Sequence, residues 1–291
     1  MINSGRMKAI LKKFEIALFV LFACGITWGL KILYTFIKGD GEPLAFNFSL
    51  LSQFGPMFSA LLVVFIFDGQ QGIKRTINSI MVYKEKMKWL LVSAMFEPVV
   101  FGVITACYWL SSGNFSVHGG APVSGSILAL FSSFALGILW WGLSEEVGWH
   151  GFLLPKLQNR FSPFSASIVL AIVTTIWHYN PNSHGQFFEF RDGLAIWGYY
   201  SPMLEQLVIS IPVTFVTTYI FNKSGGSLLA MMIFHSASNT SYFWIEGVFH
   251  IVHTDFFRAG FLVLFWLIGC IFGFLLLQPK TKSPYNSSNL Y

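Results

Sequence analysis

Charged side chains are scarce in this sequence. Asp, Glu, Lys and Arg make up only 11% of its 291 residues, whereas 54% are hydrophobic and 18% are aromatic. A soluble domain usually carries about 25% charged residues, so the composition argues against a soluble domain. The mean hydropathy of +0.62 agrees with this. We therefore predict an all-α fold, a polytopic membrane protein in which residues 1–291 form one integral membrane domain.

Cysteine is also rare. Cys24, Cys107 and Cys270 are odd in number, lie in apolar runs and show no paired spacing, which argues against a disulfide framework or a zinc ribbon. The chain contains no H-E-x-x-H sequence, so no motif directly supports a zinc site. It also shows no internal repeat, which disfavours a transporter.

Apolar runs of about 20 residues can cross a bilayer as helices, and they predict eight transmembrane spans. These are 14–37, 50–67, 89–110, a span from about 125 into the pair Glu145-Glu146, 164–178, 202–221, 227–245 and 259–277. The first run is too long for a typical signal peptide, so we expect it to persist as a span. The basic amphipathic stretch 68–88 is expected on the membrane surface, and the polar tail 279–291 is expected to be disordered.

The basic residues predict the orientation of these spans. With eight spans and a cytoplasmic N-terminus, the inner segments hold fourteen of the 18 basic residues. They are Arg6, Lys8, Lys12, Lys13, Lys74, Arg75, Lys84, Lys86, Lys88, Lys156, Arg160, Lys223, Lys280 and Lys282. Cytoplasmic loops are enriched in Lys and Arg, so we expect both termini in the cytoplasm and the protein in the plasma membrane. The net charge of +5 therefore reports topology and does not predict a nucleic-acid partner.

Two adjacent carboxylates, Glu145 and Glu146, interrupt an apolar stretch. An ionisable side chain at bilayer depth costs at least about 2.5–3.5 kcal/mol on insertion scales. In a helix, Glu146 and His150 share a face, whereas Glu145 points about 100° away. One carboxylate is then free for chemistry while the other is held by a basic partner. Alternatively, the pair lies at the cytoplasmic end of the fourth helix.

Other spans carry polar side chains as well. His178 ends the fifth span, and His235 and Asn239 lie one turn apart in the seventh. If the fourth helix continues to about Pro155, three helices bring a carboxylate, two imidazoles and an amide to one intramembrane cavity. The plainer alternative is that each histidine is a packing residue.

Two further features have no clear role. Glu97 is a buried carboxylate beside Pro98 in the third span. The last outer loop contains metal-ligand residue types, but a solvated loop is favoured there. These residues are Glu246, His250, His253 and Asp255.

The motifs resemble those of the CPBP family of membrane peptidases, which includes the type II CAAX prenyl endopeptidases of the Rce1 type. The family's E-E-x-x-x-R motif is similar to 145–150, its second motif ends in a histidine that matches His178, and its H-x-x-x-N motif matches His235 and Asn239. The resemblance covers about residues 125–242, the peptidase-like core. The chain departs from the family at His150, where the family has arginine. Arginine grips a carboxylate bidentately and stays charged, so His150 is expected to hold Glu146 less firmly.

The resemblance implies peptide-bond hydrolysis inside the membrane, in peptide maturation or bacteriocin self-immunity. Glu145 would be the general base on a water shared with His178, His235 and Asn239 would bind the oxyanion, and Glu146 and His150 would support them. The expected partners are a peptide or membrane-protein substrate and the lipid bilayer.

Two alternatives remain open at this point. Glu145, His178 and His235 are also the ligand types of a catalytic zinc site, although the resemblance favours a glutamate mechanism without a cofactor. The chain could instead be a non-catalytic binding or immunity protein that keeps the fold.

Overall fold

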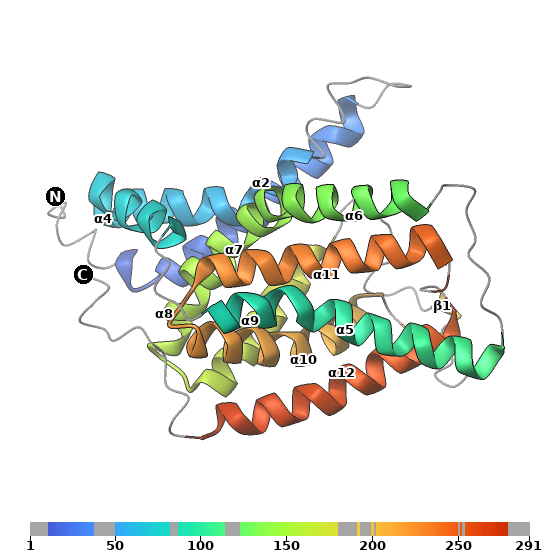
Figure 1. Ribbon diagram of the computed structural model, residues 1–291. Coiled ribbons are helices and arrows are strands. Elements are labelled where there is room, and N and C mark those ends of the chain that lie inside the picture. Colours follow the sequence, from blue (N-terminus) through green and yellow to red (C-terminus); the bar gives the residue numbers. More distant parts are fainter. Residues whose placement is uncertain are drawn as a thin grey trace, which may run out of the picture.

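The computed structural model describes residues 11–37, 50–81, 87–113, 123–179, 191–192, 199–200, 202–249, 251 and 254–278. The described chain is helical apart from two short strands (Figure 1). The long helices are α2 (Glu15–Ile37), α4 (Gly55–Met81), α5 (Met87–Ser112), α9 (Pro163–His178), α10 (Pro202–Lys223), α11 (Leu228–Phe249) and α12 (Asp255–Leu276). The all-α prediction is confirmed.

Between α5 and α9 the chain forms one continuous helical rod made of five segments. They are α6 (Val123–Gly137), the π-helical turn η1 (Ile138–Gly142), α7 (Leu143–Gly148), a second π-helical turn η2 (Trp149–Leu153) and α8 (Leu154–Gln158). The strands β1 (Arg191–Asp192) and β2 (Tyr199–Tyr200) pair antiparallel, with Arg191 opposite Tyr200.

The number of membrane spans is confirmed only in part. Among the residues that the structure describes, six helical stretches are long and apolar enough to cross a bilayer: Glu15–Ile37, Gly55–Asn78, Met87–Ser112, Ile127–Gln158, Met203–Lys223 and Asp255–Leu276. The two other predicted spans correspond to α9, which is apolar but has only 16 residues, and to α11. His235, Ser238 and Asn239 make the middle of α11 polar, and this lowers its mean hydropathy. The count of eight spans remains a prediction.

Local signals in the sequence explain several helix ends. The Ser162 side chain accepts a hydrogen bond from the backbone N–H of Ser165 at 3.2 Å, and a proline follows at the first position of α9. Thr254 caps α12 in the same way through Phe257. Both arrangements satisfy N–H groups that a helix start leaves without partners.

The stretch predicted to lie on the membrane surface, 68–88, continues α4 as far as Met81. The helix is broken at Gly69, which has a φ of 65°, a left-handed conformation that only glycine adopts readily. The predicted boundary between the second span and the surface stretch, near residue 68, therefore coincides with a break in the helix. Residues 82–86 of this stretch lie outside the described residues, as do the predicted tail 279–291, His250 and His253.

Three of the segments predicted on the inner side lie together at one end of the molecule. The Lys12 ammonium is 3.3 Å from the Asp68 carboxylate, the Lys156 ammonium is 3.0 Å from the Glu15 carboxylate, and Arg160 donates to the backbone oxygen of Lys13. The start of α2 and the end of α12 lie at this same end (Figure 1). A chain that crosses the membrane an even number of times has its first and last helix ends on the same side, as found here. The cytoplasmic orientation of this side remains a prediction.

The segment that carries the two glutamates is held at the centre of the bundle. Helix α7 packs against α4 on one side and against α11 on the other, and α11 also packs against α5 and α6. Helix α10 packs against α9 and α12. Val147, Trp149 and Leu153 belong to the main buried apolar cluster, together with Phe19 of α2.

Candidate active site

The two glutamates sit between two π-helical turns. Glu145 and Glu146 are in α7, with η1 before them and η2 after them. Each π-helical turn alters the angular spacing of side chains and often occurs at functional sites. The helix continues for twelve residues beyond Glu146, to Gln158. The alternative that the pair ends the fourth helix is therefore wrong. The helix continues beyond the pair, as predicted, and ends at Gln158, three residues after the predicted end near Pro155.

Two glycines let neighbouring helices approach α7 closely. A Cβ atom on Gly142 would lie 2.8 Å from backbone atoms of Met232 in α11, and one on Gly148 would lie 2.7 Å from the backbone oxygen of Pro56 in α4. Real Cβ atoms do not come this close to a backbone. Because glycine has no side chain at these two positions, α7 packs directly against the backbones of α4 and α11. This close packing fixes the position of α7 and of the glutamate pair that it carries.

Glu146 is held by two imidazoles. It is buried, with 6% of its surface exposed. Its Oε1 accepts a hydrogen bond from His235 Nδ1 at 2.7 Å, and its Oε2 pairs with His150 Nδ1. The predicted contact between Glu146 and His150 is present, and His235 adds a second one. Both carboxylate oxygens of Glu146 therefore have protein partners.

Glu145 is held more loosely. Its Oε2 accepts a hydrogen bond from Trp149 Nε1 at 3.2 Å. Its Oε1 lies 3.9 Å from His235 Nε2, which is beyond hydrogen-bond distance. One oxygen of Glu145 is therefore anchored, while the other lacks a direct hydrogen bond to His235.

The hydrogen bond of His178 defines its tautomer. His178 Nδ1 lies 2.7 Å from the backbone oxygen of Thr174. A carbonyl oxygen only accepts hydrogen bonds, so Nδ1 carries a hydrogen. In the neutral ring, Nε2 is then the acceptor nitrogen.

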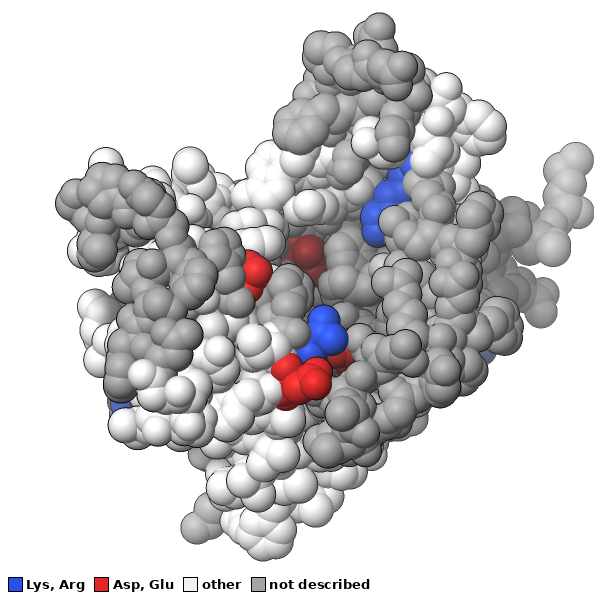
Figure 2. All heavy atoms as spheres, turned by 90° about the vertical axis from the view of Figure 1, so that its right-hand side faces the viewer, with Lys and Arg blue, Asp and Glu red and all other residues white. Residues whose placement is uncertain are grey.

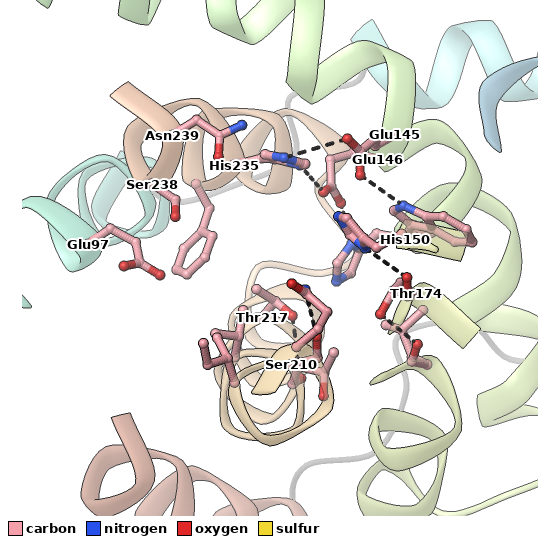
Figure 3. Close-up of a pocket in the computed structure, with 18 of the residues that line it drawn as sticks. Glu97, Glu145, Glu146, His150, Thr174, Ser210, Thr217, His235, Ser238 and Asn239 are labelled. Atoms are coloured by element: carbon pink, nitrogen blue, oxygen red, sulfur yellow. Dashed lines mark hydrogen bonds and ion pairs between the residues drawn. The ribbon is translucent and has the colours of Figure 1, made fainter. Parts of the chain in front are cut away.

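These side chains line one cavity of about 420 Å³. All four predicted catalytic residues (Glu145, His178, His235 and Asn239) and both predicted supporting residues (Glu146 and His150) contribute to its lining. Figure 3 shows His235 between Asn239 and the two glutamates. The predicted intramembrane polar cavity thus has a counterpart in the structure.

The cavity has a wall that the sequence analysis missed. Helix α10 contributes Gln206, Ser210, Thr214 and Thr217 to the lining. The last three follow a spacing of four and three residues, which places them on one helix face. This polar stripe in an otherwise apolar span is the sequence signal that could have predicted this wall of the cavity.

The described residues contain no group of three or more His, Cys, Asp or Glu side chains that could hold a metal ion. The residues of the zinc alternative, Glu145, His178 and His235, therefore do not form a ready ligand set in this arrangement.

One side of the molecule is hollowed. Viewed from the right-hand side of Figure 1, acidic side chains lie within and beside this hollow (Figure 2). A carboxylate and imidazole cluster in a cavity of an apolar helical bundle is an arrangement that suits acid–base chemistry on a substrate shielded from bulk water. Fold and site together define a multi-pass helical membrane protein with a polar cavity at its centre.

Comparison with known proteins narrows this class. Residues 126–241 match the family model described as type II CAAX prenyl endopeptidase Rce1-like. The CAAX prenyl protease 2 of Methanococcus maripaludis is 27% identical over 162 residues, which cover 51% of this chain and 56% of that protein. The chain thus spans about half the length of the curated relative that it matches. Both findings confirm the resemblance: residues 126–241 are similar to the CPBP/Rce1-like family of intramembrane proteases.

Proposed function

We propose that this protein hydrolyses a peptide bond within the membrane, with Glu145 activating the attacking water. The observation that carries the proposal is the asymmetry of the glutamate pair. Both oxygens of Glu146 are bound by imidazoles, whereas Glu145 has one oxygen anchored by Trp149 and lines the cavity. A base needs an oxygen that can take a proton, and Glu145 offers one.

The neighbouring groups fit the remaining steps. A water bound between Glu145 and His178 Nε2 would give its proton to Glu145 as it attacks the substrate carbonyl carbon. The tetrahedral intermediate carries a negative oxygen, which His235 and Asn239 would stabilise by donating hydrogen bonds. His235 would donate through Nε2 of its protonated ring, because its Nδ1 already donates to Glu146. One such donor contributes about 2.7–4 kcal/mol in other hydrolases. The protonated Glu145 then returns its proton to the departing amine.

Glu146 and His150 would hold these catalytic groups in position. Glu146 binds His235 at Nδ1, so it orients the ring that faces the substrate oxygen. His150 takes the other oxygen of Glu146 and packs against the Phe221 ring, with centroids 5.5 Å apart. We assign both residues a positioning role.

The family and the relative support a first candidate for the substrate class. Both carry the term CAAX prenyl in their descriptions, so a peptide with a prenylated C-terminal cysteine is the first candidate. Peptide maturation and bacteriocin self-immunity are further processes in which a membrane peptidase of this kind would act.

The full chain in liposomes tests the proposal directly. Wild-type protein is incubated with a short S-farnesylated peptide, with its unprenylated form and with a bacteriocin precursor peptide, and the products are identified by mass spectrometry. Glu145→Ala and His178→Ala are expected to abolish cleavage while eluting as folded protein. Wild-type protein that cleaves none of the three, together with variants that keep its full biological effect, would contradict peptide hydrolysis.

A non-catalytic binding or immunity protein is the second candidate. The observation that favours it is His150, which stands where the family has arginine. This candidate requires that Glu145→Ala protects cells as well as wild type does. The same variant therefore separates the two functions.

A further inference from the structure

Glu97 is a carboxylate in the same cavity that the proposed hydrolysis does not use. It lies in α5, has 1% of its surface exposed and contributes to the cavity lining. In Figure 3 it is on the opposite side of the cavity from the pair formed by Glu146 and His150. Ser238 and Asn239 of α11 are drawn on the same side of the cavity as Glu97 in this view.

The packing of α5 holds Glu97 in this position. Phe96 packs against Phe234 of α11, with ring centroids 5.6 Å apart, and Phe101 packs against Phe261 of α12 at 5.3 Å. These aromatic side chains, before and after Glu97, tie α5 to both neighbouring helices. The carboxyl group therefore occupies a defined place on the cavity wall.

One oxygen of the Glu97 carboxyl group makes no hydrogen bond that would stabilise the fold. Its Oε2 is buried and has no hydrogen-bond partner. The cavity lining contains no Lys or Arg among the described residues. A buried polar atom without a partner costs free energy. A structural carboxylate would be bonded, as Glu146 is.

The missing partner is a hydrogen-bond donor. The other two carboxylates of the cavity are already engaged, since Glu146 binds two imidazoles and Glu145 binds Trp149. Glu145 keeps its other oxygen for the proposed water, so Glu97 is the carboxyl group of the cavity with a buried oxygen that the hydrolysis leaves without a partner. A peptide in the cavity brings N–H groups that would otherwise lose their hydrogen bonds to water.

We infer that Glu97 binds an N–H group of the peptide substrate and thereby positions the peptide across the cavity from Glu145. The inference rests on the proposed function, because it takes the ligand to be a peptide. The donor is a backbone amide or the side chain of a basic residue, and the two are separated by experiment.

Binding is measured with full-length Glu145→Gln protein in nanodiscs, so that the peptide stays intact. The probes are a fluorescent S-farnesylated peptide with one lysine and the same peptide with norleucine at that position. Adding Glu97→Leu is expected to weaken binding of the lysine peptide about tenfold, the equivalent of one hydrogen bond. Adding Ser93→Ala is the control, because Ser93 lies one turn away in α5 and is buried without lining the cavity.

Glu97→Gln identifies the donor. If the donor is a backbone amide, the glutamine oxygen replaces the carboxyl oxygen, and the affinity for both peptides stays within about twofold of that of the parent protein. If it is the lysine ammonium, Glu97→Gln weakens the lysine peptide as Glu97→Leu does, and the norleucine peptide is insensitive to both substitutions.

Thermal unfolding separates binding from structure. Because the carboxyl group lacks a partner, Glu97→Leu is expected to leave the Tm unchanged or to raise it. A lower Tm in both Glu97 variants would overturn the inference in favour of a structural role. Unchanged binding of both peptides by Glu97→Leu would overturn it as well.

The experiments distinguish a failure of the proposed hydrolysis from a failure of the binding role of Glu97. If the parent protein binds the peptides but wild-type protein never cleaves them, hydrolysis is wrong and the binding role of Glu97 stands. If wild-type and Glu97→Leu proteins cleave with the same KM, the binding role is wrong and hydrolysis stands. A parent that binds neither peptide contradicts both.

Discussion

The two adjacent glutamates have different surroundings, although their sequence context is nearly the same. Glu146 has an imidazole on each carboxylate oxygen, whereas Glu145 has an indole N–H on one and a histidine beyond hydrogen-bond distance on the other. A carboxylate with both oxygens bound is a positioning group, and one with a spare oxygen can act as a base. This difference supports the distinct roles that we propose for the two neighbouring residues.

His150→Arg tests how Glu146 is held. Histidine loses its charge as the pH rises, whereas arginine keeps it. The ratio of the cleavage rate of His150→Arg to that of wild type is therefore expected to increase with pH. Rates measured across a pH series on one substrate would check this, with His150→Gln as an uncharged control. A ratio that stays constant would remove the charge of His150 from the mechanism.

Chelation tests the glutamate mechanism against the zinc alternative. If Glu145 activates water without a metal, cleavage is expected to persist after dialysis against a strong chelator, and purified protein is expected to contain zinc far below one ion per chain. Both are checked by activity assays and elemental analysis. Activity that falls on chelation and returns with added zinc would favour Glu145, His178 and His235 as ligands.

The element that carries the glutamates is held by close backbone approach. Helix α7 touches α4 at Gly148 and α11 at Gly142, and a π-helical turn flanks it on each side. Close approach on two faces prevents α7 from rotating or sliding. The orientation of both carboxylates thus depends on two positions that carry no functional group.

Gly148→Ala is expected to lower both stability and activity. The added methyl group would meet the backbone of Pro56, and overpacking of this kind costs about 1–3 kcal/mol in free energy of unfolding. Gly102→Ala in α5 is the matched control, because a Cβ there meets nothing within 4 Å and alanine favours a helix. Unfolding curves and cleavage rates would check both. Equal behaviour of the two variants would contradict the role of Gly148.

In the molecule as a whole, a helix outside the family match supports the site. Trp177 precedes His178, and its Nε1 donates to Thr27 Oγ1 of α2 at 2.8 Å. Trp28 donates to the backbone oxygen of Trp177, and the Trp177 ring packs edge-on against Trp149. Trp149 in turn binds Glu145. Helix α2 therefore connects to both members of the proposed water-activating pair.

Thr27→Val is expected to reduce activity although Thr27 does not line the cavity. It removes a hydroxyl that accepts from Trp177 and donates to the backbone oxygen of Ser52 at 2.8 Å. A buried N–H left without a partner costs about 1–3 kcal/mol, so the Tm should fall and kcat with it. Thr35→Val in the same helix is the control, since the Thr35 hydroxyl is exposed. A Thr27→Val enzyme with the Tm and kcat of wild type would contradict the proposed role of Thr27 in supporting the site.

The sequence was sufficient to predict the class of fold and most of the cavity. Apolar runs identify helices because a bilayer admits few other structures, and polar residues stand out in these runs because burying them is costly. For this reason Glu145, His178, His235 and Asn239 could be named before the structure was known. The stripe of Ser210, Thr214 and Thr217 gave a weaker signal, because hydroxyl groups are tolerated in apolar helices.

The partners of these residues could not be predicted, because they depend on how helices pack. Helical spacing predicts the contact between Glu146 and His150, four residues apart on one helix. It says nothing of His235, which reaches Glu146 from α11, or of Glu97, which faces the same cavity from α5. Hydropathy and spacing act within one helix, whereas the angle and distance between helices follow from interlocking side chains and from glycines such as Gly142 and Gly148. The tertiary packing therefore distinguishes the proposed base from its supporting residue and leaves Oε2 of Glu97 without a hydrogen-bond partner.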